Sequence, residues 1–276
     1  MDVIGSHAAQ LPPLDDRWEP GRFERHELIE GLLAGAIAGP QVSHPLDNVL
    51  RHIRMLTEGD PDKRFGLSGV DTAFSAREVL ELVGAEAGFE PDHDASFGPV
   101  PVDPEHVLER CEAVGDRLTL ACRRGERMIL ATGHPVGLAH LYGEVGRQLR
   151  DRGVELLEPH EGARWRDADR HDVSRVRYLN GVAMLTDTIS ARHTHSAEPM
   201  RRMLEGSSPD LVFADHGFAG AAIEAGIETV SIADVNDPAL VVARAQGRAG
   251  PAIVMDDNVE PDAYWPCFQS IVSRLP

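Results

Sequence analysis

Short apolar runs alternate with stretches of helical periodicity throughout the second half of the chain, and this rhythm restricts the fold to few classes. The apolar runs predict buried strands at residues 128–131, 154–157, 182–185, 211–214, 230–233 and 252–255. Helical stretches lie between most of them, at residues 136–152, 197–204, 219–225 and 238–245. The polar residues 158–177 predict an irregular segment. Such alternation is typical of an α/β fold with a mostly parallel sheet and helices on both faces.

The first half of the chain has a different pattern and predicts a helical N-terminal region. Apolar residues recur at helical spacing over residues 22–38, 45–56, 75–83 and 104–118, and a proline- and glycine-rich loop covers 85–104. We therefore expect a loose tail at 1–20, a helical region at 21–118 and an α/β domain at 119–276 that carries the site. The helical region can be a cap that closes over the site or a plain structural layer.

Polar side chains follow several of the predicted strands at the point where each strand ends. Gly133 and His134 follow the first strand, and Asp215 with His216, Asp234 and Asp256 follow three later ones. Ligands of open α/β sheets bind beyond the carboxyl ends of the strands. These clusters therefore predict one site built from several loops.

The clusters have the chemistry of a divalent metal site. Carboxylate oxygens and imidazoles suit Mg²⁺, Mn²⁺, Fe²⁺ or Zn²⁺, which can polarise a phosphoryl oxygen or activate water. His193 and His195 share a face if their segment is extended, as two imidazoles on one metal would. The alternative is that the acids only cap helices and turns, and that the histidines are exposed in a loop. The predicted metal ligands are His193, Asp215, His216, Asp234 and Asp256.

The turn after the first strand predicts an anion site. Thr132, Gly133 and His134 lie between a strand and a helix, where free amides favour phosphate, and Ser196 stands before another helix. These four residues are the predicted phosphate-binding set. A tight turn with a capping histidine is the alternative, and the glycine pattern lacks the dinucleotide fingerprint.

Composition excludes several classes of function. A net charge of −18, from 45 acids and 27 bases, disfavours nucleic acid and anionic membranes as partners, although acidity also serves solubility alone. Lys63 is the single lysine, which rules out a P-loop and argues against a Schiff base. No apolar run reaches the roughly 20 residues of a membrane span, so we expect a cytoplasmic protein with reduced thiols on its three cysteines.

Two further motifs are discarded. Cys111 and Arg117 have the spacing of the tyrosine phosphatase loop but lie in a segment with helical periodicity. Asp167 and Asp169 resemble the haloacid dehalogenase pair, but no apolar strand precedes them.

The order and spacing of the motifs resemble a family that is common in actinobacteria and whose members are called phosphatases. The resemblance runs from about Glu30 to the end through these segments: 47–48, 65–67, 131–135, 193–200, 210–217, 233–240 and 256–258. It departs from the family pattern at 185–188. It implies hydrolysis of phosphate monoesters, with the shared histidines and aspartates as the site.

We therefore expect a metal-dependent phosphatase that acts on a small phosphorylated metabolite. The predicted catalytic residues are His134, His195 and Asp215. One of the two histidines would protonate the leaving alkoxide. Two other classes fit the same residues: a protein that binds a phosphorylated ligand without turnover, and a sugar-phosphate isomerase or lyase. The oligomeric state is open, and a homo-oligomer fits the sequence as well as a monomer.

Overall fold

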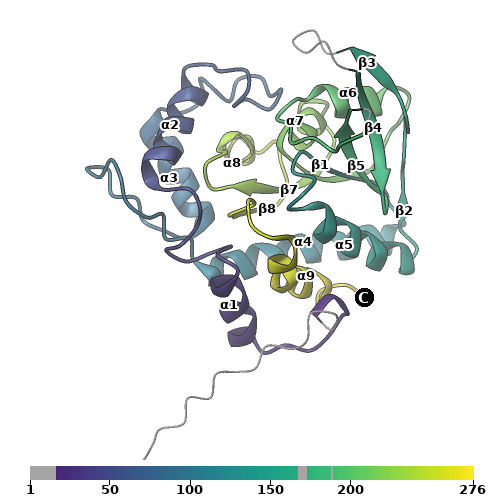
Figure 1. The fold of residues 1–276 in the computed structure, drawn as a ribbon, viewed down its shortest axis with the longest axis horizontal. Helices are drawn as coiled ribbons and strands as arrows, with labels where there is room; N and C mark the ends of the chain where they lie inside the picture. Colours follow the sequence, from purple (N-terminus) through teal and green to yellow (C-terminus); the bar gives the residue numbers. More distant parts are fainter. Residues whose placement is uncertain (1–16, 167–172, 188) are drawn as a thin grey trace, which may run out of the picture.

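The computed structural model describes residues 17–166, 173–187 and 189–276. Within these ranges nine α-helices are formed: α1 (Arg25–Ala34), α2 (Leu46–Thr57), α3 (Ala76–Ala87), α4 (Pro104–Arg124), α5 (Ala139–Asp151), α6 (Glu198–Leu204), α7 (His216–Glu224), α8 (Ala239–Ala245) and α9 (Trp265–Val272). The strands are β1 (Arg127–Thr132), β2 (Glu155–Leu156), β3 (Arg164–Arg166), β4 (Val173–Leu179), β5 (Val182–Thr186), β6 (Leu211–Asp215), β7 (Thr229–Asp234) and β8 (Ala252–Met255). Figure 1 shows their arrangement.

These strands form one mixed sheet in the order β3-β4-β5-β1-β6-β7-β8, and β2 pairs with the start of β1. Strands β5, β1, β6, β7 and β8 run parallel to one another. At one edge of the sheet, β4 runs antiparallel to both of its neighbours, β5 and β3. This confirms the predicted α/β class with a mostly parallel sheet.

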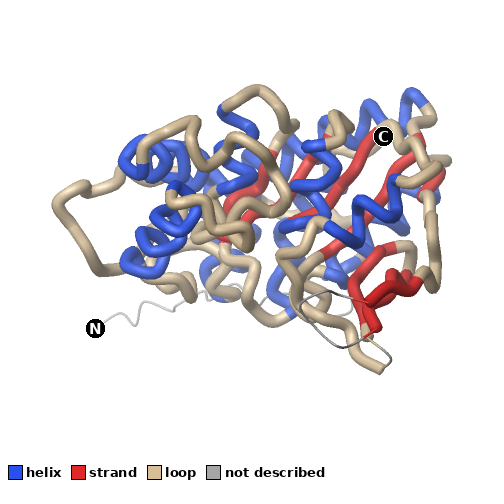
Figure 2. Tube along the Cα trace, turned by 90° about the horizontal axis from the view of Figure 1, so that it is seen from above, coloured by secondary structure: helices blue, strands red, loops and turns tan. Residues whose placement is uncertain are grey.

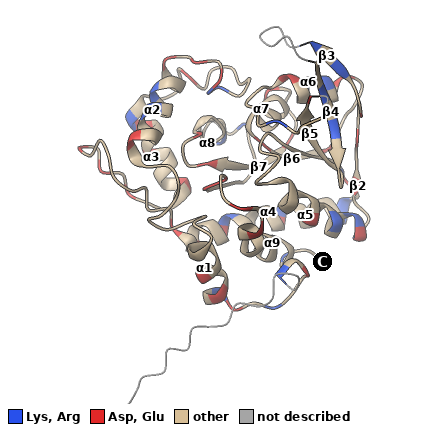
Figure 3. Ribbon diagram, viewed as in Figure 1, with Lys and Arg blue, Asp and Glu red and all other residues tan. Residues whose placement is uncertain are grey.

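The expectation of an irregular segment at 158–177 is wrong, because β3 and the start of β4 lie there. Buried and more exposed residues alternate along β4, and arginines occupy several of the more exposed positions. Arginines on edge strands interrupt the apolar run by which a buried strand is recognised. Arginines accordingly gather on β3 and β4 in Figure 3, whereas acidic residues are spread over many helices and loops.

The sheet lies between two groups of helices. Helices α4, α5 and α9 lie on one side of it and α6, α7 and α8 on the other (Figure 1). Seen from above in Figure 2, the strands lie among these helices. Helices α2 and α3 pack together beyond β8, and α3 contacts both that strand and α8.

Local sequence signals explain where some of these helices begin and end. The Ser75 hydroxyl accepts a hydrogen bond from the Glu78 amide at the start of α3, and Asp103 does the same for Glu105 at the start of α4. Helix α4 ends at Gly125, whose φ of 61° suits glycine. The discarded Cys111 and Arg117 both lie inside α4, which confirms that they form no phosphatase loop. Asp167 and Asp169 lie outside the described residues.

One hydrophobic cluster extends from the helices before β1 into the sheet and includes Leu32, Val49, Val83, Phe213 and Val254. It packs the segments around α2 against the sheet. The proposed division at residue 118 stays a prediction. None of the described helices is long and apolar enough to cross a membrane.

The order of the strands places the topological switch point of the sheet between β1 and β6. From β1 the chain continues to one side of the sheet through α5, and from β6 it continues to the other side through α7. The loops after these two strands therefore separate, which is where ligands bind in doubly wound sheets.

Candidate active site

Five aspartates are buried together beyond the carboxyl ends of β6, β7 and β8. They are Asp215, Asp234, Asp237, Asp256 and Asp257, and none is more than 5% exposed. Burying an ionised carboxylate is strongly unfavourable unless a cation or several hydrogen bonds compensate for it. The chain therefore has to supply or bind positive charge at this place.

His216 stands at the centre of the aspartates. Its Nδ1 atom is 2.7 Å from Asp215 Oδ1, and its Nε2 atom is 3.4 Å from Asp237 Oδ2 and 3.7 Å from Asp257 Oδ2. The residue has a φ of +45°, a conformation that is unfavourable for most side chains and is often kept at functional sites. It begins α7 directly after β6, three residues earlier than the sequence predicts.

Asp215 joins the segments that follow β1 and β6. Its Oδ1 atom accepts a hydrogen bond of 2.6 Å from the Gly133 amide in addition to its contact with His216. A Cβ atom at Gly133 would collide with the Thr194 carbonyl oxygen, so only glycine fits between the two loops. The Gly133 carbonyl in turn accepts a hydrogen bond from the Thr194 amide, which places His193 and His195 beside the aspartates.

His193, His195 and His216 form the first group of metal-ligand type. One nitrogen from each lies within 4.8 Å of the others. His195 Nδ1 is 2.7 Å from Asp62 Oδ2, an arrangement that orients metal-binding histidines in many proteins. Phe65 packs against the rings of His195 and His216, with centroids 5.1 and 5.3 Å away.

A second group of metal-ligand type contains His44, Asp234 and Asp256, again with ligand atoms within 4.8 Å of one another. His44 Nε2 is 3.0 Å from Asp234 Oδ2. Asp256 accepts hydrogen bonds from the backbone amides of Ser43 and Asn258, which fix its carboxylate.

The single lysine of the chain lies in this site. Lys63 is 4% exposed, and its Nζ atom is 3.2 Å from Asp237 Oδ1 and 3.8 Å from Asp62 Oδ2. His44 and His216 also face the aspartates: burial lowers the pKa of both imidazoles, but their aspartate partners raise it by more. Asp237 also has His52 Nδ1 at 3.8 Å.

The surroundings shift the pKa values of several of these groups. Burial and the neighbouring His216 hold the pKa of His193 at about 4, and they also lower that of His134. Burial would lower the pKa of His216, but Asp215 and Asp237 raise it well above its usual value. Burial and the adjacent Asp234 raise the pKa of Asp257. His193 and His134 are thus uncharged near neutral pH, as metal ligands and proton acceptors need to be.

The predicted phosphate-binding residues are close to this cluster, but several of their polar groups have partners in the protein. The Thr132 hydroxyl accepts a hydrogen bond of 2.9 Å from the His134 amide. The Ser196 hydroxyl accepts one of 3.2 Å from the Glu198 amide. His134 Nδ1 is buried and has no hydrogen-bond partner among the described residues. Their role in binding phosphate stays a prediction.

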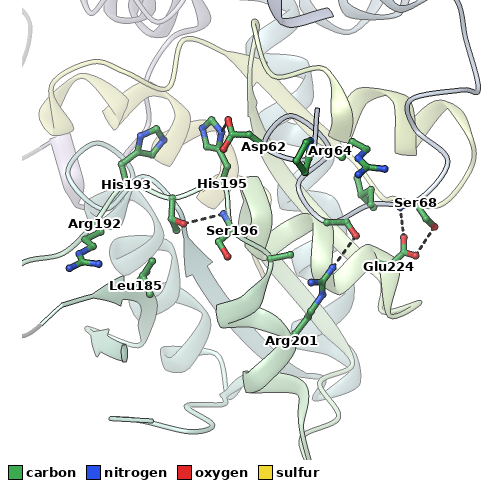
Figure 4. A pocket seen from close by; sticks show the side chains of 15 residues that line it. Asp62, Arg64, Ser68, Leu185, Arg192, His193, His195, Ser196, Arg201 and Glu224 are labelled. Atoms are coloured by element: carbon green, nitrogen blue, oxygen red, sulfur yellow. Dashed lines mark hydrogen bonds and ion pairs between the residues drawn. The ribbon is translucent and has the colours of Figure 1, made fainter. Parts of the chain in front are cut away.

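A cavity of about 1070 Å³ opens in front of His193 and His195. Figure 4 shows both histidines next to Asp62 along one wall, with Arg201 and Arg64 farther along the lining. His193 and His195, two members of the first metal-ligand group, thus line this cavity.

The sequence analysis missed the residues that the first half contributes, namely His44, Asp62 and Lys63, and it left Asp237 and Asp257 out of the ligand set. The family resemblance at 47–48 and 65–67 was a signal, since Asn48 Oδ1 accepts a 2.9 Å bond from Asn236 and Phe65 packs on two site histidines. A single lysine beside an aspartate was a second signal.

Replacing Lys63 with methionine should destabilise the protein by about 3 kcal/mol, because breaking a buried pair leaves Asp237 with less compensation. Urea unfolding of Lys63→Met measures this change. Arg77→Met on the exposed face of α3 is the matched control and should change stability by less than about 1 kcal/mol. Equal stability of the two variants would show that the lysine contributes nothing to holding Asp237.

Comparison with known proteins identifies relatives over nearly the whole chain. The sequence model of a family described as Phosphatase matches residues 23–276. Phosphatase SCO2771 of Streptomyces coelicolor is 36% identical over 252 residues, which cover 89% of this chain and 94% of that protein.

Proposed function

The chain belongs to the Phosphatase family, and on that basis we propose that it is a metal-dependent hydrolase of phosphate monoesters. The observation that carries the proposal is the cluster of five buried aspartates around His216. A phosphate monoester is an anion and would be repelled by these carboxylates alone. Bound cations would overcome this repulsion, because they would compensate the negative charge of the aspartates and attract the phosphate.

The residues fit a divalent metal. Asp257 Oδ2 and Asp215 Oδ2 are buried without a hydrogen-bond partner in the described part of the chain, and imidazoles stand beside them. His193, His195 and His216 would hold a cation together with the neighbouring carboxylates. Such a cation supplies a Lewis acid that polarises the phosphoryl group and favours attack by water.

The remaining residues orient the ligands and transfer protons. Asp62 holds His195 by Nδ1, which leaves Nε2 available to the site, and Asp215 does the same for His216. The His134 ring is 4.8 Å from that of His193 and has a nitrogen without a partner in the described chain. We assign proton transfer during hydrolysis to His134.

The substrate that we propose is a small phosphorylated metabolite. The cavity of about 1070 Å³ holds a molecule of this size with its phosphate near His193. Arginines gather on β3 and β4, at one edge of the sheet (Figure 3), and the cavity is lined by acids as well as arginines, so we do not propose nucleic acid as the substrate. Cys111, Cys122 and Cys267 are free thiols, which fits work in the cytoplasm.

The experiment is phosphate release from a panel of sugar, nucleotide and amino-alcohol phosphates, before and after removal of metal with a chelator. We expect release that the chelator abolishes and that added Mn²⁺, Mg²⁺ or Zn²⁺ restores. Release that persists after complete removal of metal would contradict metal dependence. Thermal stabilisation by the same compounds without any product would favour a binding protein, and deuterium uptake into substrate without phosphate release would favour an isomerase or lyase.

A further inference from the structure

The two groups of metal-ligand type lie side by side, and we infer that the site holds two divalent cations with Asp257 between them. His193, His195 and His216 form the first site, and His44, Asp234 and Asp256 form the second. The inference rests on the proposed function for what the cations do, but their number is measured independently of activity.

The first site offers mainly nitrogen. His195 and His216 each have Nδ1 occupied by a carboxylate, of Asp62 and Asp215 respectively, which leaves Nε2 to face a metal. The His216 Nε2 atom is also within 3.4 and 3.7 Å of Asp237 and Asp257 oxygens. Three imidazoles with a carboxylate suit Zn²⁺, Fe²⁺ or Mn²⁺.

The second site offers mainly oxygen and comes partly from the first half of the chain. Asp234 is the last residue of β7, Asp256 follows β8, and His44 stands two residues before α2. The Asp256 carboxylate is fixed by two backbone amides, and each of its oxygens keeps a lone pair for a further ligand. Such a set suits Mn²⁺ or Mg²⁺ better than the first site does.

Asp257 links the two sites. Its carboxylate is 2% exposed, its Oδ2 atom is 3.7 Å from His216 Nε2 of the first site, and the residue directly follows Asp256 of the second. Its Oδ2 atom has no hydrogen-bond partner among the described residues. A buried, unpaired carboxylate oxygen next to another carboxylate is unfavourable unless it binds a cation or takes up a proton, and a cation on each side would compensate both carboxylates. Two adjacent cations would also suit a phosphate group, whose oxygens can contact both.

Equilibrium dialysis against MnCl₂, followed by elemental analysis, counts the cations for each chain. We expect two Mn²⁺ for the unaltered protein and one for each of two double variants. His193→Ala with His195→Ala empties the first site, and His44→Ala with Asp234→Asn empties the second. His93→Ala, at a surface ion pair with Glu81, is the control and should keep two. One Mn²⁺ in the unaltered protein, or none in either double variant, would overturn the inference.

Electron paramagnetic resonance of the unaltered protein with Mn²⁺ gives a second test that needs no variant. Two cations that share Asp257 should produce a spin-coupled signal, whereas an isolated six-line signal at saturating Mn²⁺ would overturn the pair. The outcomes also separate the two proposals. Two cations without any phosphate release would refute the proposed function alone, and one cation with chelator-sensitive release would refute only the second site.

Discussion

Replacing His216 with asparagine should lower kcat/KM for phosphate release by more than about 100-fold. The substitution removes Nε2, the atom that lies 3.4 Å from Asp237 Oδ2 and 3.7 Å from Asp257 Oδ2. Mutating a residue that hydrogen-bonds to a metal ligand typically lowers metal affinity or activity 10- to 100-fold. Mutating a ligand itself should lower activity by more than that. Asparagine tolerates the φ of +45° at this position better than most residues, so the backbone should be preserved.

Steady-state assays at saturating Mn²⁺ measure this effect, and circular dichroism checks that the variant is folded. His93→Asn is the matched control and should keep full activity. His93 lines a different cavity, together with Asp47 and Arg77. If His216→Asn keeps activity within about threefold of the unaltered protein, His216 is not a metal ligand that hydrolysis needs.

Removing the metal should lower the melting temperature by roughly 10 °C or more. A ligand present at 1,000 times its Kd stabilises the folded state by about 4 kcal/mol, and two cations would add about twice that. In a chain of this size each kcal/mol shifts the melting temperature by about 2–4 °C. The physical reason is the repulsion among five aspartates that remain buried when the cations leave.

Scanning calorimetry of the metal-free and reconstituted protein measures the shift. In Asp257→Asn the rise on adding metal should be smaller, whereas the metal-free melting temperature should not fall, because that variant has one carboxylate fewer. A metal-free protein as stable as the loaded one would show that the aspartates are compensated within the chain and need no cation.

The sheet could be predicted from the chain where its strands are buried on both faces. The runs that become β1, β6, β7 and β8 are continuous and apolar, and their bounds differ from the expected ones by no more than one residue at either end. The β3–β4 hairpin escaped prediction because arginines alternate with apolar residues there. A strand that is buried on one face only has a weaker apolar pattern in the sequence than a strand that is buried on both faces.

The candidate site could be predicted only where its residues follow strands directly. Asp215, Asp234 and Asp256 were found from their places at strand ends, since the parallel sheet brings those ends to one edge. His44 and Lys63 lie more than 150 residues away from Asp234 and Asp237, respectively, and no local pattern marks such pairs. Asp237 was interpreted as a helix start, which any Asp-Pro pair suggests.

The chain by itself determined that a parallel sheet forms and that its carboxyl edge is rich in histidine and aspartate, because strand burial and the alternation with helices are local properties. Only the tertiary structure decided that the five aspartates share one buried space, and that Lys63 and His44 come from the other half of the molecule to join them. The reason is that hydrophobic packing of α2 on α3, and of α3 on β8 and α8, rather than any motif, places these side chains. The unbalanced charge that points to metal exists only after that packing has occurred.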